Sequence, residues 1–253
     1  MIHNNKYFKL ANIVFLLATT TLSYAASGKK GVGLTESTWG ATQLATLGVS
    51  WYYNWGPTTA LTTPAQFVPM SYSGNSIAKL TTTSLSLLGF NEPDNINQSN
   101  MTVSDALTLW PSLVSKAVSI GSPATAEDPV TGFWLTSFMS GAPTPKVDFV
   151  TLHWYKGPDV ARFKKDVSAL CSKFGKPVWV TEFAPQTTSS ARSNPTKYTQ
   201  TQVNSFLNSV ISWMEQQSCV QRYAWHDAKS GTSALFNADG TLTETGRAYA
   251  AAQ

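Results

Sequence analysis

Charged residues and histidines are scarce in this sequence. Asp, Glu, Lys and Arg make up 13% of the 253 residues, and there are three histidines. The 18 Lys and Arg outnumber the 14 Asp and Glu, but no basic stretch carries interleaved aromatic residues. Because such stretches are typical of nucleic-acid-binding proteins, we expect no nucleic-acid partner.

The motifs of several enzyme classes are also absent. The sequence contains no G-x-G-x-x-G or P-loop motif that would bind a nucleotide. It contains no G-x-S-x-G elbow of a serine hydrolase. It also lacks H-E-x-x-H and any cysteine cluster, so we expect neither a catalytic metal nor a cofactor.

Long hydrophobic runs are missing except near the N-terminus. Two lysines, Lys6 and Lys9, are followed by LANIVFLLATTTL, which is too short to span a bilayer, and by small residues at Ser23 and Ala25. This pattern is typical of a secretory signal peptide. We therefore predict a signal peptide at residues 1–25 and a single domain at residues 26–253. We expect a monomer that is secreted, extracellular or in the cell wall, with no membrane span.

The sequence has only two cysteines, Cys171 and Cys219. In an oxidising compartment an isolated pair favours a disulfide, which we predict here. Two buried free thiols are the alternative.

Aromatic residues, in contrast, are abundant. Phe, Trp and Tyr make up 12% of the chain, with nine Trp among them. A weakly charged, aromatic-rich secreted protein suits a neutral polar ligand such as a polysaccharide. We expect most of the Trp side chains to fill the core and a minority to line a cleft.

Eight short apolar segments predict β-strands, and several lack the alternation of a half-exposed strand, which favours a parallel sheet. They are residues 31–34, 49–55, 66–70, 84–90, 117–124, 147–155, 177–184 and 220–227. Helical spacing predicts helices at residues 158–175 and 198–217 between them. We predict a compact (β/α)8 TIM barrel with some short or missing helices, for example at residues 56–65. An open doubly wound sheet is the alternative fold.

Function in such a barrel lies at the carboxyl ends of the strands. The fourth predicted strand ends at Glu92 and the seventh at Glu182. Two carboxylates on one rim of an aromatic-lined cleft are what glycoside hydrolysis needs, since one donates a proton and the other stays ionised. The alternative for Glu92 is an ordinary turn or helix-start carboxylate. A buried Glu182 would need a cationic partner that the local sequence does not supply.

Six segments together resemble glycoside hydrolase family 128, the secreted β-1,3-glucanases and glucan-binding relatives with a glycosyl hydrolase catalytic core, which include alkali-sensitive-linkage-like proteins. In chain order they are VSWYYNWGP, FVPM, LLGFNEPD, VDFVTLHWY, PVWVTEFA and RYAWHD. GFNEPD and WVTEFA are also similar to the acid/base and nucleophile segments of retaining glycosidases. The resemblance covers residues 28–252.

The resemblance implies a role for each catalytic position. Glu92 is expected to be the general acid/base and Glu182 the nucleophile. Asn91 would hydrogen-bond the 2-hydroxyl of the sugar. His153 and Tyr155 would border the site, with Tyr155 orienting Glu182.

The remaining expectations concern substrate contacts. By resemblance Trp225 would be the sugar platform, followed by a cis peptide bond to His226. His226 itself departs from the family pattern, because many relatives carry an apolar or aromatic residue there. We expect Asn54 and Trp55 to line the outer subsites.

The predicted activity is therefore hydrolysis of β-1,3-glucan by double displacement, with the two carboxyl groups ~5–5.5 Å apart; a separation of ~9 Å would indicate inversion instead. A non-catalytic β-glucan-binding cell-wall protein on the same barrel is the main alternative. A structural wall protein or surface antigen is a third.

Overall fold

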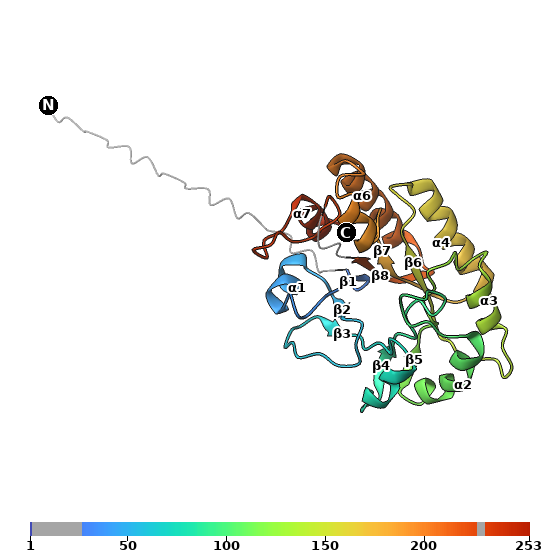
Figure 1. Ribbon diagram of the computed structural model, residues 1–253. Helices are drawn as coiled ribbons and strands as arrows, with labels where there is room; N and C mark the ends of the chain where they lie inside the picture. The colour runs from blue at the N-terminus through green and yellow to red at the C-terminus, as the bar shows by residue number, and fades with distance from the viewer. Residues whose placement is uncertain (2–26, 227–230) are drawn as a thin grey trace.

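The computed structural model describes residue 1, residues 27–226 and residues 231–253 (Figure 1). The predicted signal peptide, apart from Met1, and Asp227 lie outside the described residues. Within the described part of the chain, no helix has the length and apolar character that crossing a membrane requires.

The described residues form eight strands at the eight predicted places. They are β1 (Lys30–Gly33), β2 (Trp51–Tyr53), β3 (Gln66–Phe67), β4 (Ser84–Leu87), β5 (Ala117–Ile120), β6 (Val150–Trp154), β7 (Val178–Phe183) and β8 (Val220–His226). Six strands pair in the order β3-β2-β1-β8-β7-β6, and β4 pairs with β5. Single parallel bridges, Met70 to Leu88 and Gly121 to Phe149, join the two groups. The strands therefore close in chain order into the predicted (β/α)8 barrel.

Helices surround this central barrel (Figure 1). They are α1 (Ala41–Leu47), η1 (a 3-10 helix, Gly74–Lys79), α2 (Val103–Val114), α3 (Phe133–Met139), α4 (Val160–Phe174), α5 (Thr188–Ser193), α6 (Gln200–Gln216) and α7 (Glu244–Ala251). The connection from β2 to β3 contains no helix, as predicted from its length. The third and fourth strands are linked only through the 3-10 helix.

The two helices predicted in detail are confirmed. Asp159 caps the start of α4 by accepting a hydrogen bond from the Arg162 N–H, and Gly175 ends the helix in the left-handed conformation. Helix α6 buries the predicted apolar face: Val203, Phe206, Leu207, Val210, Ile211 and Met214. The predicted disulfide joins Cys171 at the end of α4 to Cys219 just after α6. It ties the last turns of two outer helices together.

Two lysines near the start of β1 attach the sheet to the helices. The Lys29 ammonium donates to three carbonyl oxygens at the end of α6 and just beyond it, at 2.9–3.0 Å. The buried Lys30 ammonium donates to the carbonyls of Tyr249, Ala250 and Ala252 at the end of α7. Each cation thereby satisfies the unpaired carbonyls at a helix C-terminus.

Aromatic side chains fill the interior of the barrel near the amino ends of the strands. The rings of Phe149 and Trp179 stack with centroids 4.0 Å apart, and Trp51 lies 5.4 Å from Trp179. The Arg222 guanidinium lies over both indoles, at 4.5 Å from Trp179 and 5.3 Å from Trp51. This packing fills the barrel at the end of the strands opposite to the cleft.

Candidate active site

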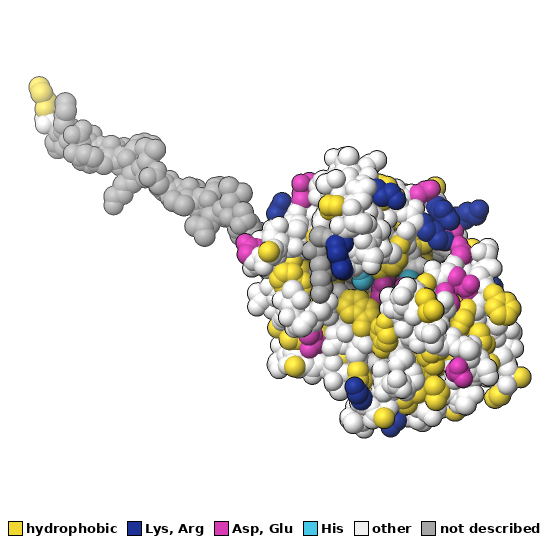
Figure 2. Space-filling model, in the orientation of Figure 1, with side chains coloured by type: hydrophobic (Ala, Val, Ile, Leu, Met, Phe, Trp, Pro, Cys, Tyr) yellow, Lys and Arg dark blue, Asp and Glu magenta, His cyan; other side chains and the backbone are white. Residues whose placement is uncertain are grey.

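A cleft of about 370 Å³ opens at the carboxyl ends of the strands. Its lining consists of Glu92, Asn95, Asn97, Gln98, Tyr155, Glu182, Thr187, Thr188, Ser189 and His226. In Figure 2, histidine and acidic side chains lie together at the bottom of a hollow in the face shown. A larger surface hollow, of about 450 Å³, lies elsewhere, but this one contains both predicted catalytic carboxylates.

Glu92 occupies an unusual backbone conformation just after the fourth strand. Its φ is +39°, in the left-handed region that residues other than glycine rarely adopt. Its N–H donates to the Ala124 carbonyl at 2.7 Å. The next acidic residue, Asp94, accepts from the N–H groups of Ala126 and Glu127, which fixes the loop. Because the loop is fixed at several points, it can hold a strained residue that aims its carboxylate into the cleft.

The contacts of Glu92 do not fit an ordinary helix-start carboxylate. Helix α2 begins only at Val103. The Glu92 side chain instead lies 2.9 Å from His153 Nδ1, and Asn95 donates to its other oxygen at 3.1 Å.

Glu182 reaches the cleft because β7 contains a bulge. Leu152 of β6 pairs with Val180 of β7, and the next pair is His153 with Glu182. Thr181 is therefore an extra residue in β7, and the bulge around it keeps Glu182 in register with His153 on the interior face. If β7 kept all its residues but had no bulge, regular alternation would put Glu182 on the outward face of Val180.

Five side chains surround the Glu182 carboxylate. Tyr53 and Trp55 donate to Oε1 at 3.0 and 2.7 Å, and Tyr155 donates to Oε2. The Nδ1 atoms of His153 and His226 both lie 3.5 Å from Oε2. The basic partners that the local sequence lacks are therefore two distant histidines.

These neighbours decide the charge of the site. Burial raises the pKa of Glu182, but the charges of His153 and His226 and the hydrogen bonds of Tyr155 and Trp55 outweigh it and lower the pKa to about 2. Burial lowers the pKa of His153, but the nearby carboxylates, Glu182 foremost, raise it above its ordinary value. Glu182 is therefore ionised at neutral pH.

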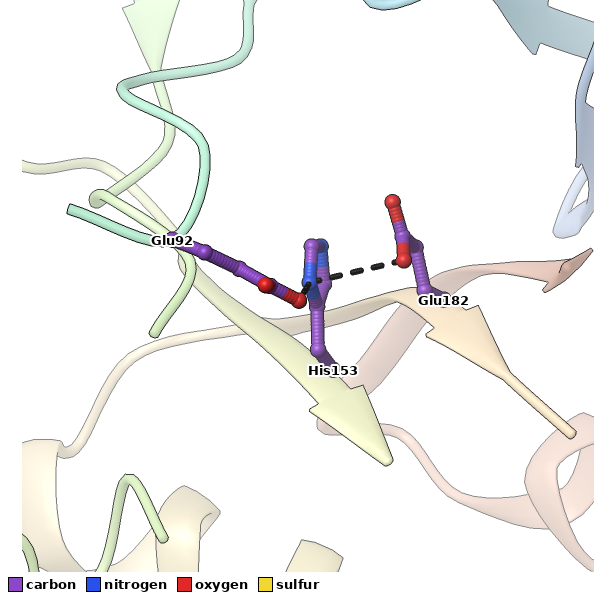
Figure 3. Close-up of side chains that lie close together, drawn as sticks. All are labelled: Glu92, His153 and Glu182. Atoms are coloured by element: carbon purple, nitrogen blue, oxygen red, sulfur yellow. Dashed lines mark hydrogen bonds and ion pairs between the residues drawn. The ribbon is translucent and has the colours of Figure 1, made fainter. Parts of the chain in front are cut away.

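The two carboxylates converge on His153, which stands between them (Figure 3). One oxygen of Glu92, one oxygen of Glu182 and a nitrogen of His153 all lie within 4.8 Å of one another. A metal ion could use donors at such distances. However, each carboxylate already accepts hydrogen bonds from neighbouring side chains. We therefore interpret the group as an acid–base network.

Trp55 lies deeper in the site than the predicted outer subsites. Its φ is +61°, and its indole N–H donates to Glu182. Two of the three described non-glycine residues with positive φ, Trp55 and Glu92, thus contact the catalytic centre. Asn54 does not line the cleft: its side chain binds Glu36 and the backbone of Thr58 and Gly56, so it stabilises a loop.

Asn91 lies beside Glu92 and is 3% exposed. Its amide N–H donates to Gln98 Oε1 at 3.3 Å, and the Tyr72 hydroxyl donates to the same oxygen. Its Oδ1 has no hydrogen-bond partner in the described part of the chain. A buried acceptor without a partner is costly, so this atom is suited to a ligand hydroxyl.

The structure corrects the prediction for Trp225. Its side chain is fully buried, packs on Phe183 and Tyr249, and donates to the Ser233 carbonyl. Alternation along β8 turns Trp225 outwards and His226 into the cleft. His226 therefore takes the place expected for the sugar platform. The expected cis peptide bond after Trp225 is not found; the cis bond in the described residues joins Ala142 and Pro143.

Sequence reasoning missed one wall of the cleft. Asn95, Asn97 and Gln98 lie in the loop after β4, and Thr187–Ser189 face them from the start of α5. The amide-rich stretch NINQSN directly after Glu92 was the available signal.

Comparisons with known proteins show which family the whole chain is similar to. Residues 31–249 match the family described as glycosyl hydrolase catalytic core. Alkali-sensitive linkage protein 1 of Schizosaccharomyces pombe is 30% identical over 247 residues, which cover 89% of this chain and 45% of the relative. The chain thus spans less than half the length of this curated relative.

The solved structures that are similar to this chain include several members of GH128. A GH128 (subgroup I) endo-β-1,3-glucanase from Amycolatopsis mediterranei, in complex with laminaritriose, is 33% identical, with a TM-score of 0.80 over 90% of this chain and 100% of that chain. A GH128 (subgroup VII) oligosaccharide-binding protein from Trichoderma gamsii is 26% identical, with a TM-score of 0.74 over 88% and 92%. A curdlan-specific exo-β-1,3-glucanase (GH128 subgroup III) from Blastomyces gilchristii is 28% identical, with a TM-score of 0.69 over 90% and 100%.

Proposed function

Because the chain belongs to the glycosyl hydrolase catalytic core family, we propose that it hydrolyses β-1,3-glucan with retention of configuration, with Glu182 as nucleophile and Glu92 as acid/base. The observation that carries this proposal is the pair of carboxylates on one rim, with oxygens within 4.8 Å of each other. Retaining glycosidases hold their carboxyl groups ~5–5.5 Å apart, whereas inverting enzymes leave room for a water molecule between them.

In the first step, ionised Glu182 attacks the anomeric carbon while Glu92 protonates the leaving oxygen. His153, 2.9 Å from Glu92, is placed to stabilise the carboxylate that Glu92 becomes after it loses its proton. In the second step, Glu92 takes a proton from water, which attacks the glycosyl ester and releases Glu182.

Neutral donors hold the nucleophile in place. Burial, with the adjacent Glu182 charge, raises the pKa of Tyr53 and Tyr155 well above the ordinary tyrosine value. Both hydroxyls therefore keep their protons and donate to Glu182 throughout the pH range of activity. These hydrogen bonds orient the carboxylate for attack. They are strongest before the attack, because ester formation removes most of the negative charge that the hydroxyls bind.

The cleft walls suit a neutral sugar. Asn95, Asn97, Gln98 and the hydroxyls of Thr187–Ser189 can each donate and accept hydrogen bonds, and none is charged. Similar structures hold laminaritriose and laminarihexaose, which are β-1,3-glucan oligosaccharides. We propose the same substrate class here, with Asn91 binding a sugar hydroxyl through its unpartnered Oδ1.

Non-catalytic glucan binding is the second candidate, because the similar Trichoderma gamsii protein is described as oligosaccharide-binding. Reducing-sugar release from laminarin and curdlan separates the two. Hydrolysis is expected for the parent and should be abolished in Glu92→Gln and Glu182→Gln, while oligosaccharide binding persists. Binding without any release by the parent would favour the binder. The anomer formed first, read by NMR, tests retention.

We further propose that residues 1–25 are a signal peptide and that the mature protein acts outside the cell. N-terminal sequencing of the protein recovered from the medium tests both, with Ala26 expected as the first residue.

A further inference from the structure

His226 is a cleft residue whose two ring nitrogens have different surroundings. Its Nε2 lies 2.6 Å from the Thr188 hydroxyl. Its Nδ1 lies 3.5 Å from Glu182 Oε2 and is buried without a hydrogen-bond partner among the described residues. One nitrogen is thus held by the cleft wall, and the other faces the carboxylate.

The charge of Glu182 decides whether Nδ1 of His226 carries a proton. If the Thr188 hydroxyl donates to Nε2, the ring proton sits on Nδ1 and faces the ionised carboxylate, which is attractive. In the opposite tautomer, the Nδ1 lone pair would face the Glu182 charge at 3.5 Å, which is repulsive. A proton on Nδ1 is therefore favoured, and the Thr188 hydroxyl, which can donate or accept, holds Nε2 in place.

Aromatic packing fixes the plane of the His226 ring. It meets Trp55 edge-to-face with centroids 5.8 Å apart and Tyr155 with centroids 5.4 Å apart. Both neighbours are themselves donors to Glu182. The ring is therefore held between two groups that already orient the same carboxylate.

The titratable groups around His226 come from three strands and the residues that follow them. They are Glu182 on β7, His153 and Tyr155 at the end of β6, and Tyr53 on β2. From β1 and α5, the neighbouring residues are Gly33 and Thr188, which carry no charge. Glu182 is thus the carboxylate that His226 contacts directly.

We propose that His226, braced by Thr188, is a positioning residue for the nucleophile, with its Nδ1–H directed at Glu182 Oε2. It keeps that carboxylate ionised and turned into the cleft, a task that an apolar or aromatic residue at this place could not perform. The inference rests on the proposed role of Glu182 as nucleophile.

The test compares His226→Phe, which keeps a ring but no donor, with His226→Gln, which keeps a donor. In His226→Phe, kcat on laminarin should fall about ten- to a hundredfold with little change in KM, as for loss of a hydrogen bond to a charged group. The acid limb of the kcat/KM profile should move up by about one pH unit, because Glu182 becomes easier to protonate. His226→Gln should recover part of both effects.

Thr188→Val provides an independent check that leaves the imidazole in place. It should move the acid limb in the same direction by a smaller amount, whereas the neighbouring wall variant Ser189→Ala should leave the acid limb where it is. Because Thr188→Val leaves the imidazole and Glu182 unchanged, it keeps the proposal testable if His226→Phe fails to fold.

Direct titration of Glu182 separates this inference from the proposed function. NMR of ¹³C-labelled Glu should show the Glu182 carboxylate titrating at higher pH in His226→Phe than in the parent, whether or not the parent hydrolyses glucan. An unchanged midpoint overturns the inference. A rise in KM with unchanged kcat and acid limb also overturns it, since that result indicates a substrate contact instead.

Discussion

Replacing Glu182 by Gln removes a charge from the centre of the site and nearly preserves its shape. Although burial raises the pKa of Glu182, the two histidines and the hydroxyl and indole donors bring it from an ordinary 4.5 to about 2. At about 1.36 kcal/mol per pH unit, a fall of this size corresponds to about 3 kcal/mol. The folded state of the parent should gain this free energy above pH 4.5 and lose it as the pH falls towards 2.

Urea unfolding followed by Trp fluorescence measures this contribution. The free energy of unfolding of the parent, relative to Glu182→Gln, should decrease by about 3 kcal/mol between about pH 6 and pH 2. Because the pKa of His153 is raised in the folded state, His153 also contributes stability, which is lost as the pH rises through that pKa. The dependence of the unfolding free energy on pH therefore reports Glu182 and His153 together. Glu244→Gln, which changes an exposed carboxylate, should show no such trend. Parallel curves for parent and Glu182→Gln would refute the reasoning.

Three further predictions concern separate parts of the molecule. Tyr155→Phe removes a donor to Glu182, so kcat/KM should fall about ten- to a hundredfold, and unchanged kinetics would contradict its orienting role. Replacing Cys171 and Cys219 by Ser opens a loop with a sequence separation of 48 residues and should lower the free energy of unfolding by about 4 kcal/mol; denaturant unfolding checks this, and equal midpoints would exclude it. Asn97 begins an N-x-S site on the cleft wall, so in a glycosylating host Asn97→Gln should lower KM for laminarin; an occupied site with equal KM would disagree.

The fold was largely predictable because its signals are local. Each strand is a short apolar run, and the boundaries of α4 follow from Asp159 and Gly175 at its two ends. Glu92 and Glu182 were predictable as a pair because parallel strands of a barrel end on one rim.

The details of the cleft depend on register, which the sequence does not specify. Arg222 and His226 share one face of β8, and Tyr223 and Trp225 share the other, but the sequence does not say which face lines the barrel. The orientation of Asn54 is set by Glu36, a partner on another loop. The pairing of His153 with Glu182 depends on a shift between strands that only the assembled sheet defines.

The extra residue in β7 has a consequence for how this protein can vary. The bulge lets two consecutive residues, Thr181 and Glu182, face the interior between the outward-facing Val180 and Phe183. Deleting Thr181 would leave Glu182 directly after the outward-facing Val180, so regular alternation would still direct the carboxylate inwards. A seventh strand that is one residue shorter could therefore keep the nucleophile in register with His153.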